Sequence, residues 1–483
     1  MPGDLARAPA VMKWYSAAAG RSRKGETMNG QIFREYDIRG LVDQDLTPGV
    51  VEGLGLGLGT VVKRKGGRSV TVGRDCRESS TRFRDALISG LTRTGLDVVD
   101  VGVVPTPLTY FAANVLPVDG LAMITGSHNP PEYNGFKIGY GKTTFHGGEI
   151  QELRRLIETG DFEKGAPGKV TAFDIVTPYH HFVRQTVAVG RKGMKVVVDA
   201  GNGTGGEIAV PLFRSMGFEV VPLFCEMDAR FPNHHPDPTV AENLEDLIQA
   251  VKREKAEVGI AYDGDADRLG VVDDQGTILW GDRLMILFAR AVLREVPGAA
   301  IVGEVKCSST LYEDIAAQGG KPIMWKAGHS LIKAKMKEER AELAGEMSGH
   351  VFFKHRYYGF DDGVYASARL LEILTHEKRK LSELLSDVPK TYASPEIRVD
   401  ASEDKKFDIV RAATALLKRD GHPTIEVDGV RATFPDGAWG LIRASNTGPL
   451  LVLRFEAKTE ERLAEVEALM QETVVRAKRE VGA

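Results

Sequence analysis

The sequence predicts an α/β protein with three similar mixed α/β domains followed by a smaller C-terminal α+β domain. A length of 483 residues has room for roughly three or four hydrophobic cores, at about 150 residues per domain. From Met28 onwards, strand-like and helix-like patterns alternate, and this alternation restarts twice. Near the C-terminus the pattern changes to paired strands between two helices, which is typical of an antiparallel sheet.

The first α/β segment opens with a predicted strand at residues 69–72. Apolar residues then recur at helical spacing over 81–94. β-Branched residues predict a second strand at 96–101, and a third strand at 121–125 ends in a loop. This alternation predicts βαβ units and a parallel sheet.

The two following segments repeat the order of strand, helix and strand. The predicted elements of the second segment are 195–199, 208–216, 218–223 and 258–261. Those of the third are 300–302, 309–317 and 322–325. In the C-terminal segment we expect helices and antiparallel strands at 407–418, 424–434 (two strands around Asp428-Gly429), 438–445, 450–457 and 460–480.

Composition excludes several classes of protein. Apolar residues make up 42% and charged residues 27%, which is ordinary for a soluble globular chain. The 63 basic and 67 acidic residues leave a net charge of −4, so we expect neither nucleic acid nor a membrane as a partner. No apolar run reaches the ~20 residues of a membrane span. The three widely spaced cysteines Cys76, Cys225 and Cys307 suit a reducing compartment, and we predict a cytoplasmic protein.

Residues 1–27 form a basic N-terminal extension that we interpret as flexible. They carry five basic residues against Asp4 and Glu26, without the apolar stretch of a signal peptide. A transit peptide, or a true start at Met28, are the alternatives.

The first chemical motif is Thr125-Gly126-Ser127-His128-Asn129-Pro130-Pro131, directly after a predicted strand. Gly126 allows an unusual backbone turn, and the two prolines fix the exit of the loop. A serine at the end of a strand presents its hydroxyl where α/β folds place their chemistry. An ordinary polar turn is the alternative interpretation.

The second motif is Asp263-Gly264-Asp265-Ala266-Asp267-Arg268, which also follows a strand directly. Three carboxylates in one place repel one another, and a divalent cation with oxygen ligands relieves this repulsion. An EF-hand would need glycine where Arg268 stands. A solvated acidic turn is the remaining alternative.

Four further stretches are less specific when each is taken alone. Residues 201–206 match G-x-G-x-x-G, but a lone match is weak evidence for a dinucleotide, and packing or anion binding explains such glycines equally well. Gly53, Gly55, Gly57 and Gly59 are interpreted as packing glycines. Residues 345–350 combine a carboxylate, a hydroxyl and an imidazole, and residues 443–449 suit a phosphate.

Taken together, these loops resemble the α-D-phosphohexomutase superfamily, and most closely its phosphomannomutase/phosphoglucomutase group. The resemblance runs from about Ile32 to the end of the chain. Its motifs, in order, are residues 33–40, 125–137, 231–244, 263–268, 326–330, 345–350 and 443–449. The resemblance implies four domains around a central cleft, each donating one loop. We place these domains, which carry the phosphoserine, metal, sugar-binding and phosphate-binding loops, at 28–176, 177–278, 279–393 and 394–483.

The resemblance also implies a role for each matching residue. Ser127 would carry a phosphoryl group, and its phosphate would join Asp263, Asp265 and Asp267 in holding Mg²⁺. The implied catalytic residues beside that phosphate are Arg39, Lys137 and His350, the last two as proton-transfer groups. The implied substrate-binding residues are Tyr36, Arg268, Lys306, His329, Glu346, Ser348, Arg443, Ser445, Asn446 and Thr447.

The implied reaction interconverts hexose 1-phosphate and hexose 6-phosphate, with mannose or glucose as the sugar, through a reorienting sugar 1,6-bisphosphate. Glucose 1,6-bisphosphate or mannose 1,6-bisphosphate would be the activator, and a monomer or weak homo-oligomer is expected. Phosphoglucosamine mutase is the alternative within the family, although that branch usually has Gln where Met347 stands. A metal-dependent sugar phosphatase and an inactive sugar-phosphate-binding relative are the alternatives outside it. Intact Ser127 and the three aspartates disfavour the inactive relative.

Overall fold

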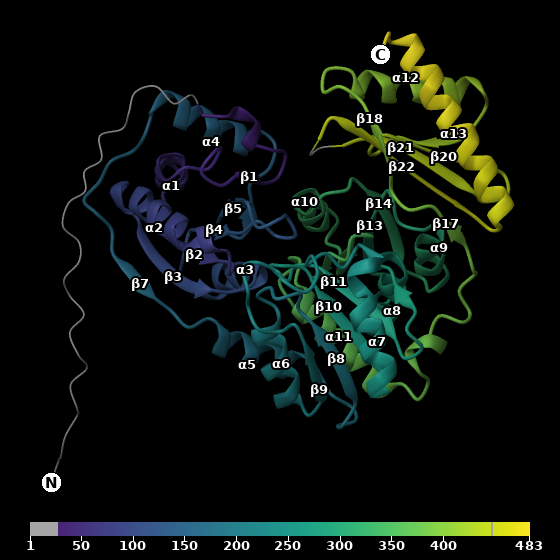
Figure 1. Ribbon diagram of the computed structural model, residues 1–483, viewed down its shortest axis with the longest axis horizontal. Helices are drawn as coiled ribbons and strands as arrows, with labels where there is room; N and C mark the ends of the chain where they lie inside the picture. The colour runs from purple at the N-terminus through teal and green to yellow at the C-terminus, as the bar shows by residue number, and fades with distance from the viewer. Residues whose placement is uncertain (1–27, 446–447) are drawn as a thin grey trace.

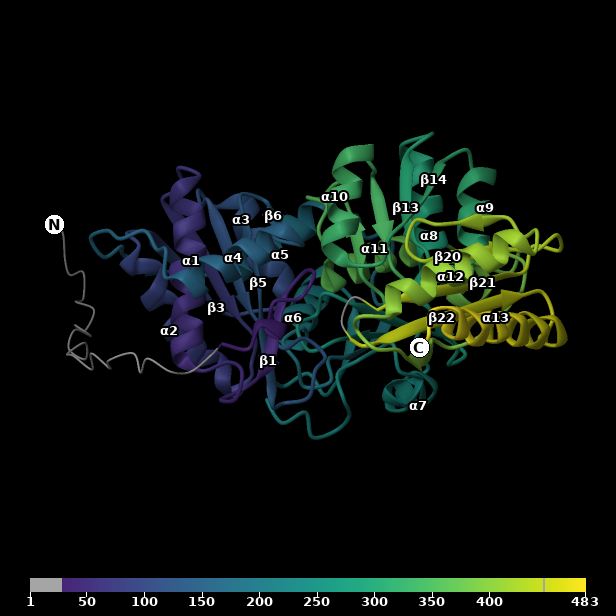
Figure 2. The same ribbon diagram turned by 90° about the horizontal axis from the view of Figure 1, so that it is seen from above.

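The computed structural model describes residues 28–445 and 448–483, and four β-sheets organise this part of the chain. The sheets follow one another along the sequence (Figure 1). Seen from above, the first and the last sheet lie at opposite ends of the molecule (Figure 2). Among the described residues, no helix is both long enough and apolar enough to cross a membrane.

The first sheet has seven strands in the order β1-β5-β4-β2-β3-β7, with β6 paired to β5. Its strands are β1 Ile38–Leu41, β2 Ser69–Arg74, β3 Asp97–Val103, β4 Gly120–Ile124, β5 Tyr133–Tyr140, β6 Thr143–Thr144 and β7 Val170–Ala172. Its helices are η1 Gly30–Ile32, α1 Pro48–Arg64, α2 Glu78–Arg93, α3 Thr106–Val115 and α4 Gly148–Thr159.

The second sheet has five strands in the order β12-β11-β10-β8-β9. These strands are β8 Lys195–Asp199, β9 Glu219–Leu223, β10 Val258–Tyr262, β11 Leu269–Asp273 and β12 Ile278–Leu279. The helices of this part are α5 Val176–Thr186, α6 Gly206–Met216, η2 Ala241–Leu244 and α7 Glu245–Glu254.

The third sheet has four strands in the order β14-β13-β15-β16. These strands are β13 Ala300–Glu304, β14 Lys321–Trp325, β15 Leu343–Gly345 and β16 Val351–Phe353. The accompanying helices are α8 Gly281–Glu295, α9 Ser309–Ala317, α10 His329–Glu339, α11 Gly363–His376 and η3 Leu381–Glu383.

The fourth sheet is antiparallel throughout, in the order β17-β22-β21-β20-β19 with β18 paired to β22. Its strands are β17 Tyr392–Ala393, β18 Ile397–Asp400, β19 Thr424–Ile425, β20 Val430–Thr433, β21 Trp439–Ala444 and β22 Leu450–Ala457. Helices α12 Lys406–Arg419 and α13 Glu460–Glu480 cover one face (Figure 1). This confirms the predicted class of three α/β units plus one α+β unit.

The first three sheets are mixed rather than wholly parallel, because one strand in each turns back on its neighbour. Strand β4 pairs in parallel with β2, whereas β5 returns antiparallel to β4. The same return joins β10 to β11 and β15 to β16, and β21 and β22 are antiparallel neighbours too. Each chemical motif occupies the connection between two such strands. Both ends of each loop are therefore anchored in the same sheet.

Glycines between α1 and α2 confirm the predicted packing role. A Cβ on Gly55 would lie 2.2 Å from the carbonyl oxygen of Leu87. A Cβ on Gly90 would lie 2.3 Å from the carbonyl oxygen of Glu52. The two helices can therefore approach closely only where both lack a side chain.

Candidate active site

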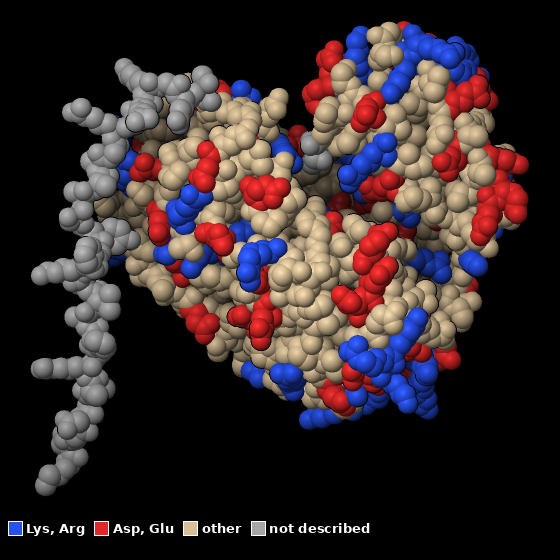
Figure 3. Space-filling view, viewed as in Figure 1, with Lys and Arg blue, Asp and Glu red and all other residues tan. Residues whose placement is uncertain are grey.

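The functional loops of the four sheets border a recess in the protein surface. The space-filling view shows a deep notch between the N-terminal and the C-terminal parts of the chain (Figure 3). Contacts between loops of different sheets define its floor. Ser127 of the first loop touches Asp263 of the second, Arg268 of the second bonds His350 of the third, and Ala327 in the third part bonds Asp428 in the fourth.

Ser127 lies at the meeting point of the first two loops. Its backbone has a left-handed φ of 50°, and its side chain is 3% exposed. The hydroxyl Oγ donates a hydrogen bond to Asp263 Oδ2 at 3.0 Å and lies 3.1 Å from His128 Nδ1. A Cβ on Gly264 would lie 2.5 Å from the Ser127 carbonyl oxygen, so the aspartate loop needs glycine there. The serine is thus held directly against the carboxylate cluster.

Arg77 fixes the serine loop, and the sequence analysis missed it. This buried guanidinium at the start of α2 bonds Asp75 Oδ2 through Nε at 3.1 Å. Its two terminal nitrogens donate to four backbone carbonyls of the loop, those of Ser127, Asn129, Pro130 and Tyr133. Each of its five N–H groups therefore has an acceptor. No local motif around Arg77 indicates this role, because the carbonyl oxygens that it bonds lie about fifty residues further along the chain.

The three aspartates form a buried cluster that fits a divalent cation. Asp263, Asp265 and Asp267 each offer an oxygen, and these oxygens lie within 4.8 Å of one another. All three side chains are 0% exposed. Oδ1 of Asp265 and Oδ1 of Asp267 accept no hydrogen bond from the described part of the chain. Buried carboxylate oxygens without donors are the ligands that Mg²⁺ prefers.

Lys137 and Thr106 hold the other faces of this cluster. Lys137, buried on β5, donates to Oδ2 of Asp265 at 2.8 Å and also bonds Oδ2 of Asp267. Burial acts to lower the pKa of Lys137, but the two carboxylates outweigh it and hold that pKa well above its ordinary value. Thr106, at the start of α3, donates to Asp265 Oδ2. These bonds leave the Oδ1 atoms available.

Charge repulsion within the cluster is visible in the pKa of Asp263. Burial is the largest cause that raises this pKa well above its ordinary value, followed by the charges of Asp267 and Asp265. Burial also acts to raise the pKa of Asp265, but Lys137 and hydrogen bonds outweigh it and lower that pKa. The positive charges of Arg268 and Lys137 act to lower the pKa of Asp263 but do not outweigh its burial and the two neighbouring carboxylates. Further positive charge is needed for all three to ionise together.

The glycine-rich stretch at 201–206 supports the aspartate loop from behind. A Cβ on Gly203 would lie 2.6 Å from the Gly264 carbonyl oxygen, and the Thr204 amide donates to that same oxygen at 3.0 Å. A Cβ on Gly205 would lie 2.9 Å from the ring of Tyr262. The glycines thus serve close packing, which was the alternative to dinucleotide binding.

His350 lies at the junction of the second and third loops. Arg268 Nε donates to His350 Nε2 at 3.1 Å, and His350 Nδ1 lies 3.2 Å from Asp361 Oδ2. The ring of His329 stacks on that of His350 with centroids 5.9 Å apart. Burial is the main cause that lowers the pKa of His329 well below its ordinary value, and Lys333 adds to it. His329 is therefore neutral at physiological pH.

The third loop forms the next wall of the cleft through Glu346. Glu346 is buried, and its Oε1 accepts a hydrogen bond from the Gly328 amide at 2.6 Å. Lys306 Nζ donates to Glu396 Oε1 at 2.6 Å and lies 3.7 Å from Glu304. Burial acts to lower the pKa of Lys306, but these two carboxylates raise it above its ordinary value. Lys306 is therefore a fixed positive charge.

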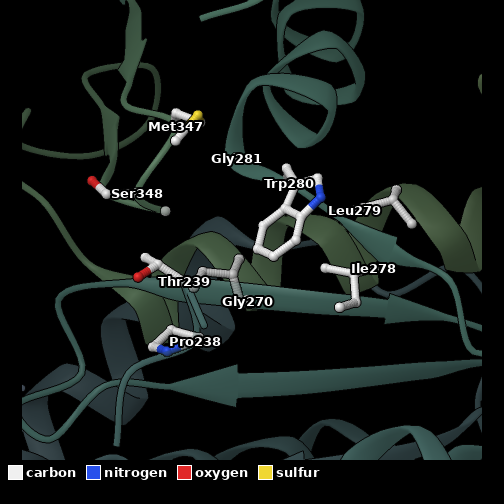
Figure 4. Close-up of a pocket in the computed structure, with 11 residues that line it drawn as sticks. Pro238, Thr239, Gly270, Ile278, Leu279, Trp280, Gly281, Met347 and Ser348 are labelled. Atoms are coloured by element: carbon white, nitrogen blue, oxygen red, sulfur yellow. The ribbon is translucent and has the colours of Figure 1, made fainter. Parts of the chain in front are cut away.

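Ser348 and Met347 sit over a water-sized pocket behind this loop. The pocket holds about 10 Å³ and is bounded on its far side by Thr239, Gly270 and Trp280 (Figure 4). A Cβ on Gly281 would lie 2.4 Å from the Glu346 carbonyl oxygen. The start of α8 therefore supports the loop closely.

Arg443 at the end of β21 offers an unused donor. Its Nε donates to Asp428 Oδ2 at 3.0 Å, whereas its buried Nη2 finds no partner among the described residues. Lys406, in the first turn of α12, donates to the carbonyl oxygens of Ser445 at 2.7 Å and Gly448 at 3.2 Å. Two predicted residues, Asn446 and Thr447, lie outside the described residues.

Tyr36 and Arg39 approach the cleft from the N-terminal side. The Tyr36 ring meets the His329 ring edge-on, with centroids 5.7 Å apart. Arg39 donates to Asn129 Oδ1 and to Asp37 Oδ2, each at 2.6 Å. Arg39 is thereby tied to the serine loop.

Direct contacts join Ser127, the three aspartates, Lys137, Arg268, His350, His329 and Tyr36 in one connected group. A presented serine, a carboxylate cluster that fits a cation and a surrounding set of Lys and Arg side chains are the equipment of phosphoryl transfer. Fold and site together define a multidomain enzyme of that chemical class.

Comparisons with known proteins agree with this class. Four family models, described as phosphoglucomutase/phosphomannomutase, match successive parts of the chain. They are α/β/α domain I at residues 30–164, α/β/α domain II at 177–276, α/β/α domain III at 280–392 and the C-terminal domain at 396–473. Together they match most of the chain.

Individual relatives extend over the same length. A phosphomannomutase/phosphoglucomutase from Pseudomonas aeruginosa is 50% identical over 452 residues, which cover 93% of this chain and 96% of the relative. A phosphoglucomutase from Neisseria gonorrhoeae is 46% identical, covering 89% and 93%. A crystal structure of a phosphoglucomutase/phosphomannomutase family protein from Burkholderia thailandensis gives a TM-score of 0.89 at 44% identity, covering 94% and 98%. This chain belongs to the phosphoglucomutase/phosphomannomutase family of the α-D-phosphohexomutase superfamily.

The role of Arg77 gives a testable prediction. Lysine offers three donors without the planar fork, so Arg77→Lys leaves loop carbonyls unsatisfied. Amide hydrogen exchange across residues 126–133 should rise at least about tenfold, the equivalent of about 1.4 kcal/mol of lost local stability. Arg82→Lys, on the exposed face of the same helix, is the matched control and should leave the loop unchanged. Equal exchange in both variants would show that Arg77 does not hold the loop.

Proposed function

We propose that this protein interconverts hexose 1-phosphate and hexose 6-phosphate, with mannose, glucose or both as the sugar. The observation that carries the proposal is the position of Ser127, whose hydroxyl is hydrogen-bonded to Asp263, one of three clustered carboxylates that could hold a cation. Its 50% identity to a phosphomannomutase/phosphoglucomutase supports the same reaction. Ser127 would exchange a phosphoryl group with either end of the sugar, through a 1,6-bisphosphate that reorients between two transfers.

Mg²⁺ is the cation we infer, held by Asp263, Asp265 and Asp267 together with the Ser127 phosphate. The free Oδ1 atoms of Asp265 and Asp267 support this assignment. When bound, Mg²⁺ supplies positive charge that stabilises the transferring phosphoryl group. Arg39 and Arg268 contribute further positive charge at the same end of the cleft, and both are held by hydrogen bonds.

Two residues move protons in this proposal. Lys137 lies among the aspartates, where it can give a proton to the Ser127 oxygen as the phosphoryl group leaves and recover it on return. His350 takes the proton of the attacking sugar hydroxyl. His329 stacks on His350, and Tyr36 contacts His329 in turn, so these two rings would border the substrate beside His350.

The other end of the sugar phosphate would bind at the C-terminal loop. Arg443, Ser445, Asn446 and Thr447 form the proposed clamp for the phosphate that is not being transferred. The unpartnered Nη2 of Arg443 supports this role. Glu346 and Ser348 would bind sugar hydroxyls between the clamp and Ser127, with Lys306 as a further positive charge.

Each proposed domain contributes one loop, with the domains at residues 28–176, 177–278, 279–393 and 394–483. Glucose 1,6-bisphosphate or mannose 1,6-bisphosphate is the inferred activator, because it phosphorylates an unphosphorylated serine. We also infer a cytoplasmic monomer or weak homo-oligomer. Three free cysteines support a reducing compartment.

A kinetic comparison tests the proposed reaction. The enzyme with Mg²⁺ and a bisphosphate activator is assayed with glucose 1-phosphate, mannose 1-phosphate and glucosamine 1-phosphate. We expect the 6-phosphate of glucose or mannose as product, with phosphate conserved on sugar. Preference for glucosamine 1-phosphate would indicate a phosphoglucosamine mutase instead. Steady release of inorganic phosphate would indicate a phosphatase.

The shared clamp predicts a symmetric binding defect. Lysine cannot reproduce a guanidinium that bonds Asp428 through Nε and a phosphate through Nη2, so Arg443→Lys should bind substrate more weakly. We expect a loss of about 1–3 kcal/mol for both the 1-phosphate and the 6-phosphate, measured by equilibrium titration. Arg398→Lys, on an exposed position of the same sheet, should bind normally. Weakening for one isomer alone would mean that the two ends bind at separate sites.

A further inference from the structure

Asp361 is a buried carboxylate in the cleft that the roles assigned above do not use. It is 0% exposed and lies between β16 and α11, with its backbone bridged to Phe352. Its Oδ2 lies 3.2 Å from His350 Nδ1, and its Oδ1 accepts a hydrogen bond from Lys333 Nζ at 3.2 Å. A buried charge at this position requires a reason, because removing a carboxylate from water is costly.

The hydrogen bond from Arg268 shows which nitrogen of His350 carries a proton in this structure. A guanidinium N–H can only donate, so His350 Nε2 accepts at 3.1 Å and must hold a lone pair. The proton of the neutral ring is therefore on Nδ1. Two carboxylate oxygens face that nitrogen, Asp361 Oδ2 at 3.2 Å and Asp267 Oδ1 at 3.6 Å.

Of these two oxygens, Asp361 Oδ2 is the one available to the histidine. Asp267 Oδ1 belongs to the set proposed for the cation. The contact of His350 with Asp361 is at ion-pair distance without full hydrogen-bond alignment. Catalytic hydrogen bonds of this kind often tighten only when substrate binds.

Lys333 keeps Asp361 ionised and in place. Its ammonium group bonds Asp361 Oδ1 and sits 4.4 Å from the centre of the Tyr110 ring. Burial acts to raise the pKa of Asp361, but Lys333 and His350 outweigh it and hold that pKa well below its ordinary value. The carboxylate facing His350 is therefore charged and fixed from its far side.

We propose that Asp361 is a positioning residue that holds His350 with its proton on Nδ1 and its Nε2 lone pair open to the sugar hydroxyl. This inference rests on the proposed function. In the transfer step a bond forms between the sugar oxygen and phosphorus while the bond from phosphorus to Ser127 Oγ breaks. The hydroxyl proton moves to His350 Nε2, and Ser127 Oγ takes a proton from Lys137 Nζ. The imidazolium that results faces the Asp361 carboxylate.

For this step the Arg268 guanidinium must release His350 Nε2, and Asp237 is a second partner that can keep the guanidinium in place. Its Nη1 lies 3.7 Å from Asp237 Oδ1, so the guanidinium remains paired when its Nε gives way to the substrate hydroxyl. Asp267, His350 and Asp361 could also be a second cation site by distance alone. Lys333 already bonds Asp361, and Asp267 Oδ1 belongs to the set proposed for the first cation, which disfavours a further cation there.

A double-mutant cycle tests the positioning role on the full-length, Mg²⁺-loaded enzyme. Asp361→Asn keeps the size of the side chain and removes its charge. We expect kcat to fall at least about tenfold, with KM within about threefold, since proton transfer contributes on the order of 10²–10⁴ in rate. In a His350→Gln background the same substitution should change kcat by less than about twofold, because Asp361 acts through His350.

Asp362→Asn is the matched control. Asp362 is an adjacent buried carboxylate that bonds the hydroxyls of Tyr179 and Tyr357 and caps α11 through the Tyr365 amide. Asparagine caps helices equally well, so kcat should stay within about twofold. Multiplicative losses in the double variant, or a KM rise with unchanged kcat, would overturn the proposal.

A measurement without turnover separates this inference from the proposed function. In protein labelled with ¹⁵N-histidine, the signal of His350 is identified by its loss in His350→Gln. With hexose 1-phosphate bound to the unphosphorylated enzyme, so that Arg268 has released Nε2, we expect the Nδ1–H form in the wild-type protein and a shift toward the Nε2–H form in Asp361→Asn. An unchanged tautomer in Asp361→Asn would overturn the positioning role, even in a fully active mutase. If the tautomer shifts but the enzyme lacks mutase activity, only the proposed function fails.

Discussion

The contact between the serine loop and the aspartate loop is the constraint on which the rest of the site depends. Ser127 can touch Asp263 only because Gly264 leaves room for the serine backbone, and because Gly203 leaves room behind Gly264. These loops belong to two different sheets. Their close packing therefore fixes the first two sheets relative to each other and places Ser127 beside the three aspartates at once.

Charge balance follows from that contact. Burying three aspartates together is unfavourable, and Lys137 from the first sheet compensates part of the cost from within the cluster. Arg268 extends the network to His350 in the third sheet, and Lys333 extends it through Asp361. The polar floor of the cleft is one connected set of alternating charges. Such a set suits a reaction in which negative charge moves between two ends of a substrate.

Much of the fold could be predicted because its strands and helices have strong periodic patterns. The strand at 195–199 and the helices at 309–317 and 460–480 have their predicted bounds. The returning strands β5, β11 and β16 were not predicted, because each follows a loop whose polar residues hide the short apolar pattern. The predicted parallel pairing of the strands near 69–72, 96–101 and 121–125 is confirmed, and the antiparallel return of β5 is an addition to it.

Candidate site residues could be predicted from the sequence where they stand in distinctive local motifs. Ser127 and the three aspartates stand in loops with distinctive neighbours, so they could be found directly. Residues that act on distant backbone or on other side chains carry no such signal. Arg77 reaches loop carbonyls, Lys406 bonds the carbonyls of Ser445 and Gly448, and Asp428 joins Ala327 to Arg443. Only the folded chain brings these groups to their targets.

Direct observation of the phosphoryl group on Ser127 tests the account most closely. The enzyme is treated with a sugar bisphosphate that carries labelled phosphates. One sample is digested at once, and a second is digested after unlabelled hexose 1-phosphate has been added. In both samples the peptide containing residues 125–131 is analysed by mass spectrometry. The account predicts labelled phosphate on Ser127 that is then transferred quantitatively to the sugar. Label on another residue, or its release as inorganic phosphate, would contradict it.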